Sequence, residues 1–120
     1  MTPSVVLEPG GVVLATRVRR ARTLRERTRG LVGAPELVPG ECLWIERPAH
    51  SLPGDAVHTF GMRYAVDVLF CDRDGGVRHV IHGLRPGRVS RFVPGARYVL
   101  ELPAGTLDND LAPGGRIIID

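Results

Sequence analysis

Several side chains with chemically useful groups lie in one otherwise apolar stretch of this 120-residue chain, residues 57–70, which reads VHTFGMRYAVDVLF. The guanidinium group of Arg63 matches the planar geometry of carboxylates and phosphates, and the carboxylate of Asp67 can fix a bound group through hydrogen bonds. We therefore expect a groove for a small anionic ligand or a protein partner, lined by His58, Thr59, Arg63, Asp67 and Glu101.

The spacing within this stretch predicts two faces. In an ideal strand alternate side chains share a face, so one face carries the apolar positions together with His58 and Met62, provided that Gly61 does not break the register. We expect that face to belong to the core and His58 to be a structural histidine. Arg63 and Asp67 then lie on the other face, about 13 Å apart, which is too far for a direct ion pair unless the strand bends.

An enzymatic alternative uses the same residues. His58 with Asp67 as a base or a ligand suits a hydrolytic enzyme or a small metalloprotein, and His58 with Met62 offers the soft ligands that copper prefers. No nearby cysteine or histidine completes a metal motif, and the sequence has no P-loop, dinucleotide fingerprint, Cys-x-x-Cys or serine-elbow pattern. We therefore favour a non-enzymatic binding domain, and we expect neither a cofactor nor a metal.

A second alternative is nucleic-acid binding by the stretch Arg17–Arg29, which contains seven arginines and one glutamate. Guanidinium groups can neutralise phosphates. The stretch has no aromatic residues on which bases could stack, and half of it has the pattern of a capped helix with a solvated face. We therefore do not favour nucleic acid as the partner.

Composition places the chain among small globular proteins. It is 43% hydrophobic with a formal net charge of +3, all 16 of its basic residues are arginine, and its length fits one domain, residues 1–120. No apolar run approaches the roughly 20 residues of a membrane helix, and the first residues lack the pattern of a secretion signal. We expect a cytoplasmic monomer in which Cys42 and Cys71 are reduced thiols.

Turn signals divide the chain into many short strands. The Thr23-x-x-Glu26 capping box predicts one short helix over Leu24–Leu31. About eight strands at this spacing predict a mainly β single domain, either a sandwich or a partly closed barrel. The strand-like segments are Val5–Glu8, Val12–Val18, Cys42–Glu46, Val57–Thr59, Ala65–Phe70, Val77–His82, Arg88–Val93, Ala96–Leu102 and Arg116–Ile119.

Asp72, Asp74 and Gly75 resemble the opening of a calcium-binding loop. The closing glutamate of such a loop would fall at residue 83, which is Gly83. The same residues are typical of a tight hairpin turn, because Gly75 accepts the left-handed backbone conformation that such turns need. We therefore expect a turn between two paired strands, and no calcium.

The string His58–Phe70 resembles the hallmark of a bacterial and archaeal family catalogued as domain of unknown function one-ninety-two. The typical pattern there is His-Thr-Phe-x-Met-Arg-Phe-Pro-Ile-Asp-Val-x-Phe and then an Asp-Gly turn; here Ala65 replaces the proline. Further matches cover nearly the whole chain: Ala15-Thr16, Arg29-Gly30-Leu31, Gly40–Ile45, Leu84-Arg85-Pro86 and Tyr98–Gly105. The resemblance implies a small β-rich fold with no assigned function and no catalytic residues. The hallmark positions fall on His58, Met62, Asp67, Glu101 and Gly105.

Overall fold

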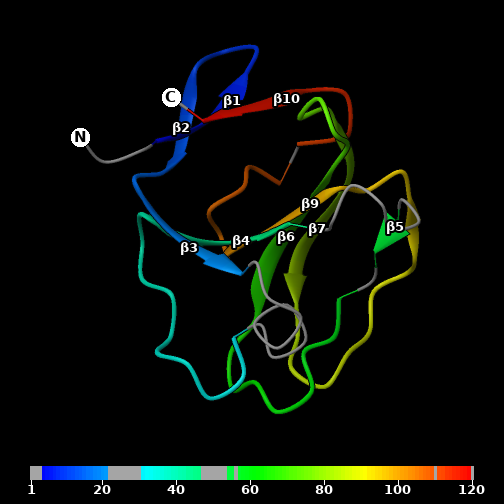
Figure 1. Ribbon diagram of the computed structural model, residues 1–120. Helices are drawn as coiled ribbons and strands as arrows, with labels where there is room; N and C mark the ends of the chain where they lie inside the picture. The colour runs from blue at the N-terminus through cyan, green and yellow to red at the C-terminus, as the bar shows by residue number, and fades with distance from the viewer. Residues whose placement is uncertain (1–3, 22–30, 47–53, 56, 110, 120) are drawn as a thin grey trace.

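Short strands joined by tight turns build the fold. The computed structural model describes residues 4–21, 31–46, 54–55, 57–109 and 111–119, and all statements about strands refer to these residues. They form a five-stranded, a three-stranded and a two-stranded sheet (Figure 1). In chain order the strands are β1 (Val5–Glu8), β2 (Val12–Ala15), β3 (Arg17–Ala21), β4 (Glu41–Glu46), β5 (Gly54–Asp55), β6 (Val66–Cys71), β7 (Val77–Leu84), β8 (Val93–Pro94), β9 (Tyr98–Pro103) and β10 (Arg116–Ile119).

The five-stranded sheet forms the centre of the domain. Its strand order is β3-β4-β9-β6-β7, and neighbouring strands are antiparallel except for the parallel pair β3–β4. All six residues of the interior strand β6 are buried. A strand covered on both faces is apolar at successive positions instead of alternating, which explains the nearly continuous apolar run of β6.

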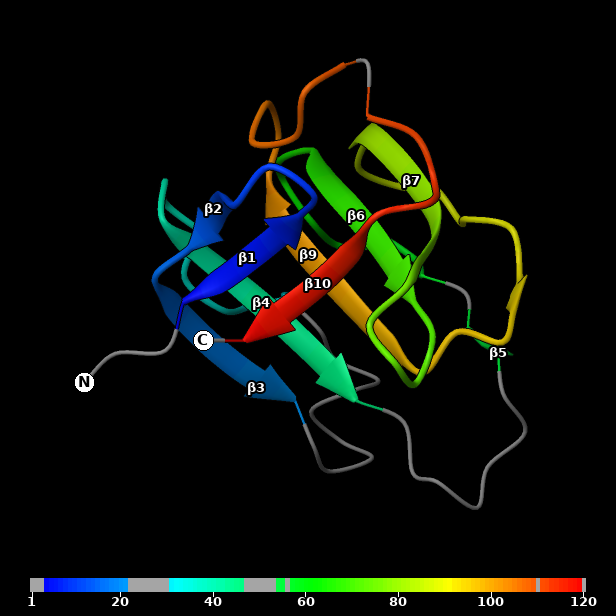
Figure 2. The same cartoon turned by 90° about the horizontal axis from the view of Figure 1, so that it is seen from above.

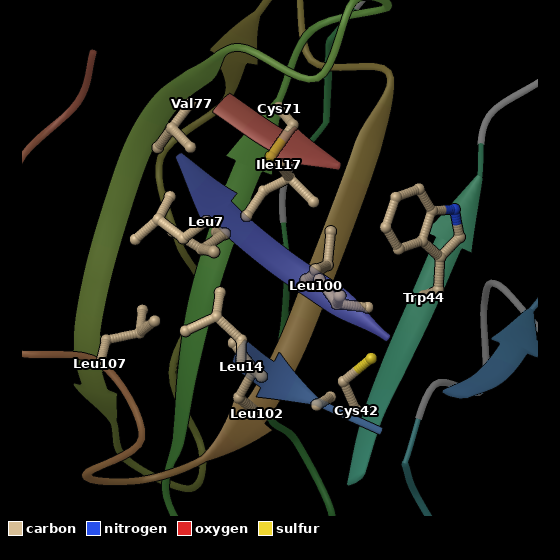
Figure 3. Packing of buried hydrophobic residues seen from close by; sticks show 13 residues of the cluster. Leu7, Leu14, Cys42, Trp44, Cys71, Val77, Leu100, Leu102, Leu107 and Ile117 are labelled. Carbon is tan, nitrogen blue, oxygen red and sulfur yellow. The ribbon is translucent and has the colours of Figure 1, made fainter. Parts of the chain in front are cut away.

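The three-stranded sheet, of order β10-β1-β2, covers one face of the central sheet (Figure 2). Leu7, Leu14 and Ile117 of this sheet pack in one cluster with Trp44 and Leu100 of the central sheet (Figure 3). Full burial of one such aliphatic side chain stabilises the fold by about 1.5–3 kcal/mol. This cluster therefore holds the two sheets together as a sandwich.

The first and last described strands lie side by side. β1 pairs antiparallel with β10, from Val5 opposite Ile119 to Glu8 opposite Arg116. The first and the last described strand therefore both belong to the three-stranded sheet (Figures 1 and 2).

Loops and the small sheet β5–β8 cover the other face of the central sheet. Val68, Phe70 and Val99 form a second cluster with apolar residues from outside the central sheet, among them Leu37 and Val57. Phe70 and Val99 are fully buried. The central sheet thus has a core on each face, and loop segments complete the second one.

The predicted class, a mainly β single domain of the sandwich type, is confirmed. The described part of the chain does not form a closed barrel, because β3 and β7, at the two ends of the strand order, do not pair with each other. It contains no helix long and apolar enough to cross a membrane. The predicted helix Leu24–Leu31 lies outside the described residues except for Leu31, which is in a turn.

Most predicted strands differ from the observed ones by one or two residues at their ends, and two are broken up in the structure. Val12–Val18 is divided at Thr16 into β2 and β3, which belong to different sheets; the backbone N–H groups of Thr16 and Arg17 both donate to the carbonyl oxygen of Gly40. Arg88–Val93 has only an isolated bridge at Val89 before β8 begins. Periodicity cannot show where a strand leaves one sheet for another, since the apolar pattern continues through the change.

The turn predicted at residues 72–76 is confirmed. The Asp72 carboxylate accepts hydrogen bonds from the backbone N–H groups of Asp74 at 2.9 Å and Gly76 at 2.8 Å. The tip of the hairpin also contacts β10, because the N–H of Ile117 donates to the Gly75 carbonyl at 2.7 Å. Gly75 has a φ of +88°, and a Cβ atom there would meet the backbone oxygen of Ile117.

Gly75→Ala should therefore destabilise the domain more than Gly87→Ala. Gly87 also has a positive φ, of +75°, but a Cβ atom there would meet nothing within 4 Å. The left-handed conformation costs a non-glycine residue about 1–2 kcal/mol at either position, and the contact with β10 should add at least about 1 kcal/mol at Gly75. Urea denaturation measures both losses; equal losses would contradict the packing of the hairpin on β10.

Candidate functional site

The Asp67 side chain is buried and joins three segments of the chain. Its Oδ1 accepts a hydrogen bond from the N–H of Gly83 at 2.8 Å, and its Oδ2 accepts from the N–H groups of Gly105 at 3.0 Å and Leu107 at 2.9 Å. Asp67 is only 1% exposed, so it would lose its hydration without compensation if these donors were missing. The three donors explain how a carboxylate is accommodated inside β6.

The first of these donors comes from a bulge in β7. His82 and Gly83 together stand opposite the single residue Asp67, because the β6–β7 pairing shifts between Val66 and Val68. A bulge leaves an extra backbone group without a partner in the ladder, and here the carboxylate supplies that partner. The other two donors lie in the loop after β9. Asp67 therefore fixes both a sheet edge and a loop.

Glu101 is a second buried acid, and it lies on the opposite face of the sheet. It stands opposite Leu43 on β4 and Val68 on β6, whose side chains belong to the loop-covered core. Burial raises the pKa of Tyr64, and the charge of Glu101 adds to this effect. Val68 follows Asp67 in β6, and adjacent residues of a strand point to opposite faces of the sheet. Since Glu101 shares the face of Val68, Asp67 and Glu101 cannot line one pocket.

Thr59 is fully buried and fastens the loop that follows β7. Its hydroxyl donates to the carbonyl oxygen of Arg85 at 2.5 Å and accepts from the N–H of Arg88 at 2.9 Å. Its own N–H donates to the Arg88 carbonyl at 2.8 Å, and its carbonyl accepts from the Gly87 N–H at 3.0 Å. Thr59 thus holds the backbone of the loop that carries Arg85 and Arg88.

A tight turn from Thr59 to Met62 separates inward from outward side chains. The N–H of Met62 donates to the Thr59 carbonyl at 3.2 Å and Gly61 has a φ of +83°, as in a type II turn. A Cβ atom at Gly61 would lie 3.2 Å from the side chain of Val32, so the Val32 side chain would have to shift slightly to admit it. The turn breaks the register at Gly61, on which the expected shared face depended: Met62 is buried, whereas Phe60 is exposed.

His58 and Phe60 are exposed next to each other. His58 forms an antiparallel bridge with Val89, in the closely spaced pairing whose side chains lie on one face. The ring centroids of His58 and Phe60 are 5.5 Å apart and the ring planes differ by 23°. Phe60 is 53% exposed and Val89 is 59% exposed. The assignment of His58 and Phe60 to a core face was therefore wrong, because the turn directs Phe60 outward.

We call residues 57–64 and 84–94 the surface ribbon. The two segments are joined by backbone hydrogen bonds between Thr59 and Arg88 and between Val57 and Ser90. They contain no aspartate or glutamate. Their exposed residues include the apolar side chains of Phe60, Val89 and Phe92 and four arginines, Arg63, Arg85, Arg88 and Arg91.

The five predicted site residues do not line a common groove. His58 and Arg63 are exposed residues of the surface ribbon, whereas Thr59, in the same segment, is buried. Asp67 faces the three-stranded sheet, and Glu101 faces the loop-covered core. His58 and Asp67, the pair on which the enzymatic alternative depends, are therefore not assembled. The described residues include no group of three or more His, Cys, Asp and Glu side chains that could hold a metal ion.

The arginine-rich stretch Arg17–Arg29 is described only as far as Ala21. Within this part, Arg19 donates to Glu41 at 3.1 Å and to the Pro35 carbonyl at 2.7 Å. The N–H of Val38 is the largest cause that lowers the pKa of Glu41, and Arg19 adds to it. Arg19 is thus used inside the domain, and the remainder of the predicted nucleic-acid segment lies outside the described residues.

Sequence reasoning missed the surface ribbon apart from His58 and Arg63. Phe60 was assigned to the core, Arg85 to a loop and Arg88 to the start of a strand, and neither arginine was considered for the site. One signal was available, because both segments of the ribbon combine arginines with exposed aromatic residues and no acid. It could not be interpreted without the pairing of residues 57–60 with 87–90, which no local pattern predicts.

These features define a small β-sandwich domain with a basic, aromatic surface. The sequence profile of the DUF192 family, described as "Uncharacterized ACR", matches residues 5–119. The chain therefore belongs to the DUF192 family, as its hallmark segment indicated. A relative from Thermococcus sibiricus, named "UPF0127 protein", is 35% identical over 101 residues. The match covers 82% of this chain and 62% of that relative, so the chain spans less than two thirds of the relative's length.

Two solved structures share the fold. A protein of Sinorhizobium meliloti described as a "putative transcription regulator" superposes with a TM-score of 0.80 at 22% identity, over 99% of this chain and 94% of that one. A protein of unknown function from Novosphingobium aromaticivorans has a TM-score of 0.78 at 19% identity, over 96% and 83% of the two chains. At such low identities these likenesses show the fold alone.

Asp67→Asn should destabilise the domain by about 2–4 kcal/mol, because the amide must turn its NH₂ group toward at least one of the backbone donors and leave it unpaired. The matched control is Asp74→Asn in the exposed hairpin, which should change stability by no more than about 0.5 kcal/mol. The free energy of unfolding in urea measures both variants. A similar small loss in both would mean that the Asp67 hydrogen bonds are not structural.

The two free cysteines should be unreactive in the folded protein. Cys42 and Cys71 are buried between the sheets, and burial raises the pKa of Cys42 to about 11 and that of Cys71 to about 12. The reactive form is the thiolate, so iodoacetamide at pH 8 should label neither residue in the native state and both in urea. Mass spectrometry counts the labels; rapid native labelling would contradict this burial.

Proposed function

We propose that this domain acts by binding an anionic partner on the surface ribbon, not by catalysis. The observation that carries the proposal is the gathering of exposed rings and exposed arginines in two paired segments without any acidic residue. Four arginines there give a local charge of +4, against +3 for the whole chain. A surface of one sign attracts partners of the opposite sign and increases their rate of association.

The arginines of the surface ribbon are available for such a partner. Among the described residues, the ion pairs connect Arg17 and Arg19 to Glu41 and involve no arginine of the ribbon. Arginine presents a planar set of donors that suits carboxylate and phosphate groups. Arg63 was expected to hold an anionic group, and its exposure supports that role, now together with Arg85 and Arg88.

Two buried polar side chains, those of Asp67 and Thr59, serve the fold instead of binding the partner. Asp67 uses both carboxylate oxygens for backbone N–H groups. Thr59 uses its hydroxyl to position Arg85 and Arg88. The backbone of the arginine loop is thereby fixed before a partner arrives, which lowers the entropic cost of binding.

We further propose that the domain works as a monomer in the cytoplasm. Cys42 and Cys71 are both free and both buried, and thiols of this kind are typical of proteins from reducing compartments. The mass of the purified domain measured by light scattering tests the monomer.

Arg85→Glu with Arg88→Glu should abolish retention of the domain on heparin, a polyanion, at low salt. The control is Arg73→Glu with Arg116→Glu, two exposed arginines away from the surface ribbon. Each pair changes the net charge by four, from +3 to −1, so general electrostatics affects both variants alike. Retention of the control but not of the ribbon variant supports the proposal, provided that both melt as the parent does. Equal elution of the two variants would contradict it.

A further inference from the structure

We infer that the anionic partner of the surface ribbon is a single-stranded nucleic acid. This inference rests on the proposed function and specifies its ligand. Binding of single strands combines a positively charged path for the phosphates with aromatic side chains on which bases stack. The surface ribbon brings both elements together.

The stacking element is the pair of rings His58 and Phe60. Their planes differ by only 23° and their centroids are 5.5 Å apart, so the two rings are stacked and a base can extend the stack. Phe60 is 53% exposed although it is a large apolar side chain, and the type II turn at Gly61 holds it in that position. Because every base has a π face, such a surface accepts bases without regard to sequence.

The phosphate-binding element is the loop that carries Arg85 and Arg88. Thr59 binds the backbone of both residues, and Thr59 lies between His58 and Phe60 in the chain. The arginines are therefore anchored directly beside the rings. A nucleotide whose base stacks on Phe60 would have its phosphate near these guanidinium groups, which form bidentate hydrogen bonds with phosphate.

An acidic peptide would use the arginines but not the rings. Its carboxylates need guanidinium partners, whereas the exposed rings would remain in water unless the peptide also supplied apolar groups. A nucleotide supplies an anion and a flat apolar surface in one unit. The combination of features on the surface ribbon therefore favours a nucleic acid over an acidic protein.

The same criterion separates the surface ribbon from the arginine-rich stretch Arg17–Arg29. That stretch has more arginines but no aromatic residue among them, which was one of the two reasons for not favouring nucleic acid as the partner. The surface ribbon fulfils the criterion, because it carries Phe60 and Phe92 together with its arginines.

The experiment compares Phe60→Leu with Phe60→Tyr in binding to a fluorescent 15-nucleotide oligothymidylate, followed by anisotropy at several salt concentrations. Leucine keeps an apolar side chain but removes the ring, whereas tyrosine keeps the ring. Loss of one stacked base should weaken binding about 5- to 150-fold in the leucine variant and leave the tyrosine variant close to the parent. Affinity for the oligonucleotide should fall steeply with salt.

Heparin and polyglutamate, two polyanions without bases, distinguish failure of this inference from failure of the proposed function. Unchanged heparin retention of Phe60→Leu, together with its weaker binding to oligothymidylate, supports the inference. Equal binding of oligothymidylate by both variants, or tighter binding of polyglutamate than of oligothymidylate, overturns the nucleic-acid inference but leaves the anionic partner in place. No binding of any of the three polyanions by the parent protein overturns both.

Discussion

Three hydrogen bonds to one buried carboxylate control how the segments of this domain meet. Asp67 lies on the interior strand β6 and binds backbone groups of β7 and of the loop after β9. A buried charge is tolerated only where such partners are already in position. The bulge of β7 and the conformation of the 105–107 loop therefore both depend on the two carboxylate oxygens of Asp67. The three donors are backbone N–H groups, which every residue except proline has. Changing the side chains that carry them therefore does not remove the need for an acceptor at residue 67.

The central sheet is covered on both faces, and this constrains where a binding site can be. Side chains of β6 and β9 are used in one core or the other, including the acids Asp67 and Glu101. Interaction with other molecules is then left to the segments at the periphery. The surface ribbon consists of two such segments, and its buried residues Val57 and Val93 belong to the loop-covered core. The same short segments therefore contribute buried side chains to the core and exposed rings to the surface.

The sequence predicted the class of fold correctly because turn signals and short apolar runs are local. The hairpin at residues 72–76 follows from Asp72 and Gly75 alone. The sequence allowed a bulge or bend at Gly61, but it could not show that this is a tight turn that directs Phe60 outward and Met62 inward. Nor could it show that Asp67 and Glu101 lie on opposite faces, because that depends on which strands flank β6. His58 and Arg63 were placed in a candidate site, but their neighbours Arg85 and Arg88 come from a segment more than 20 residues away.

The pairing of β1 with β10 has a consequence for the way this domain can be joined to others. Val5 and Ile119 stand opposite each other, on the sheet that covers the face of the central sheet remote from the surface ribbon. A domain whose first and last strands pair can be inserted into an exposed loop of a host protein, because the two ends of the interrupted loop then stay close together. In such a fusion the host would adjoin the three-stranded sheet, and the rings and arginines on the opposite side of the domain would stay accessible.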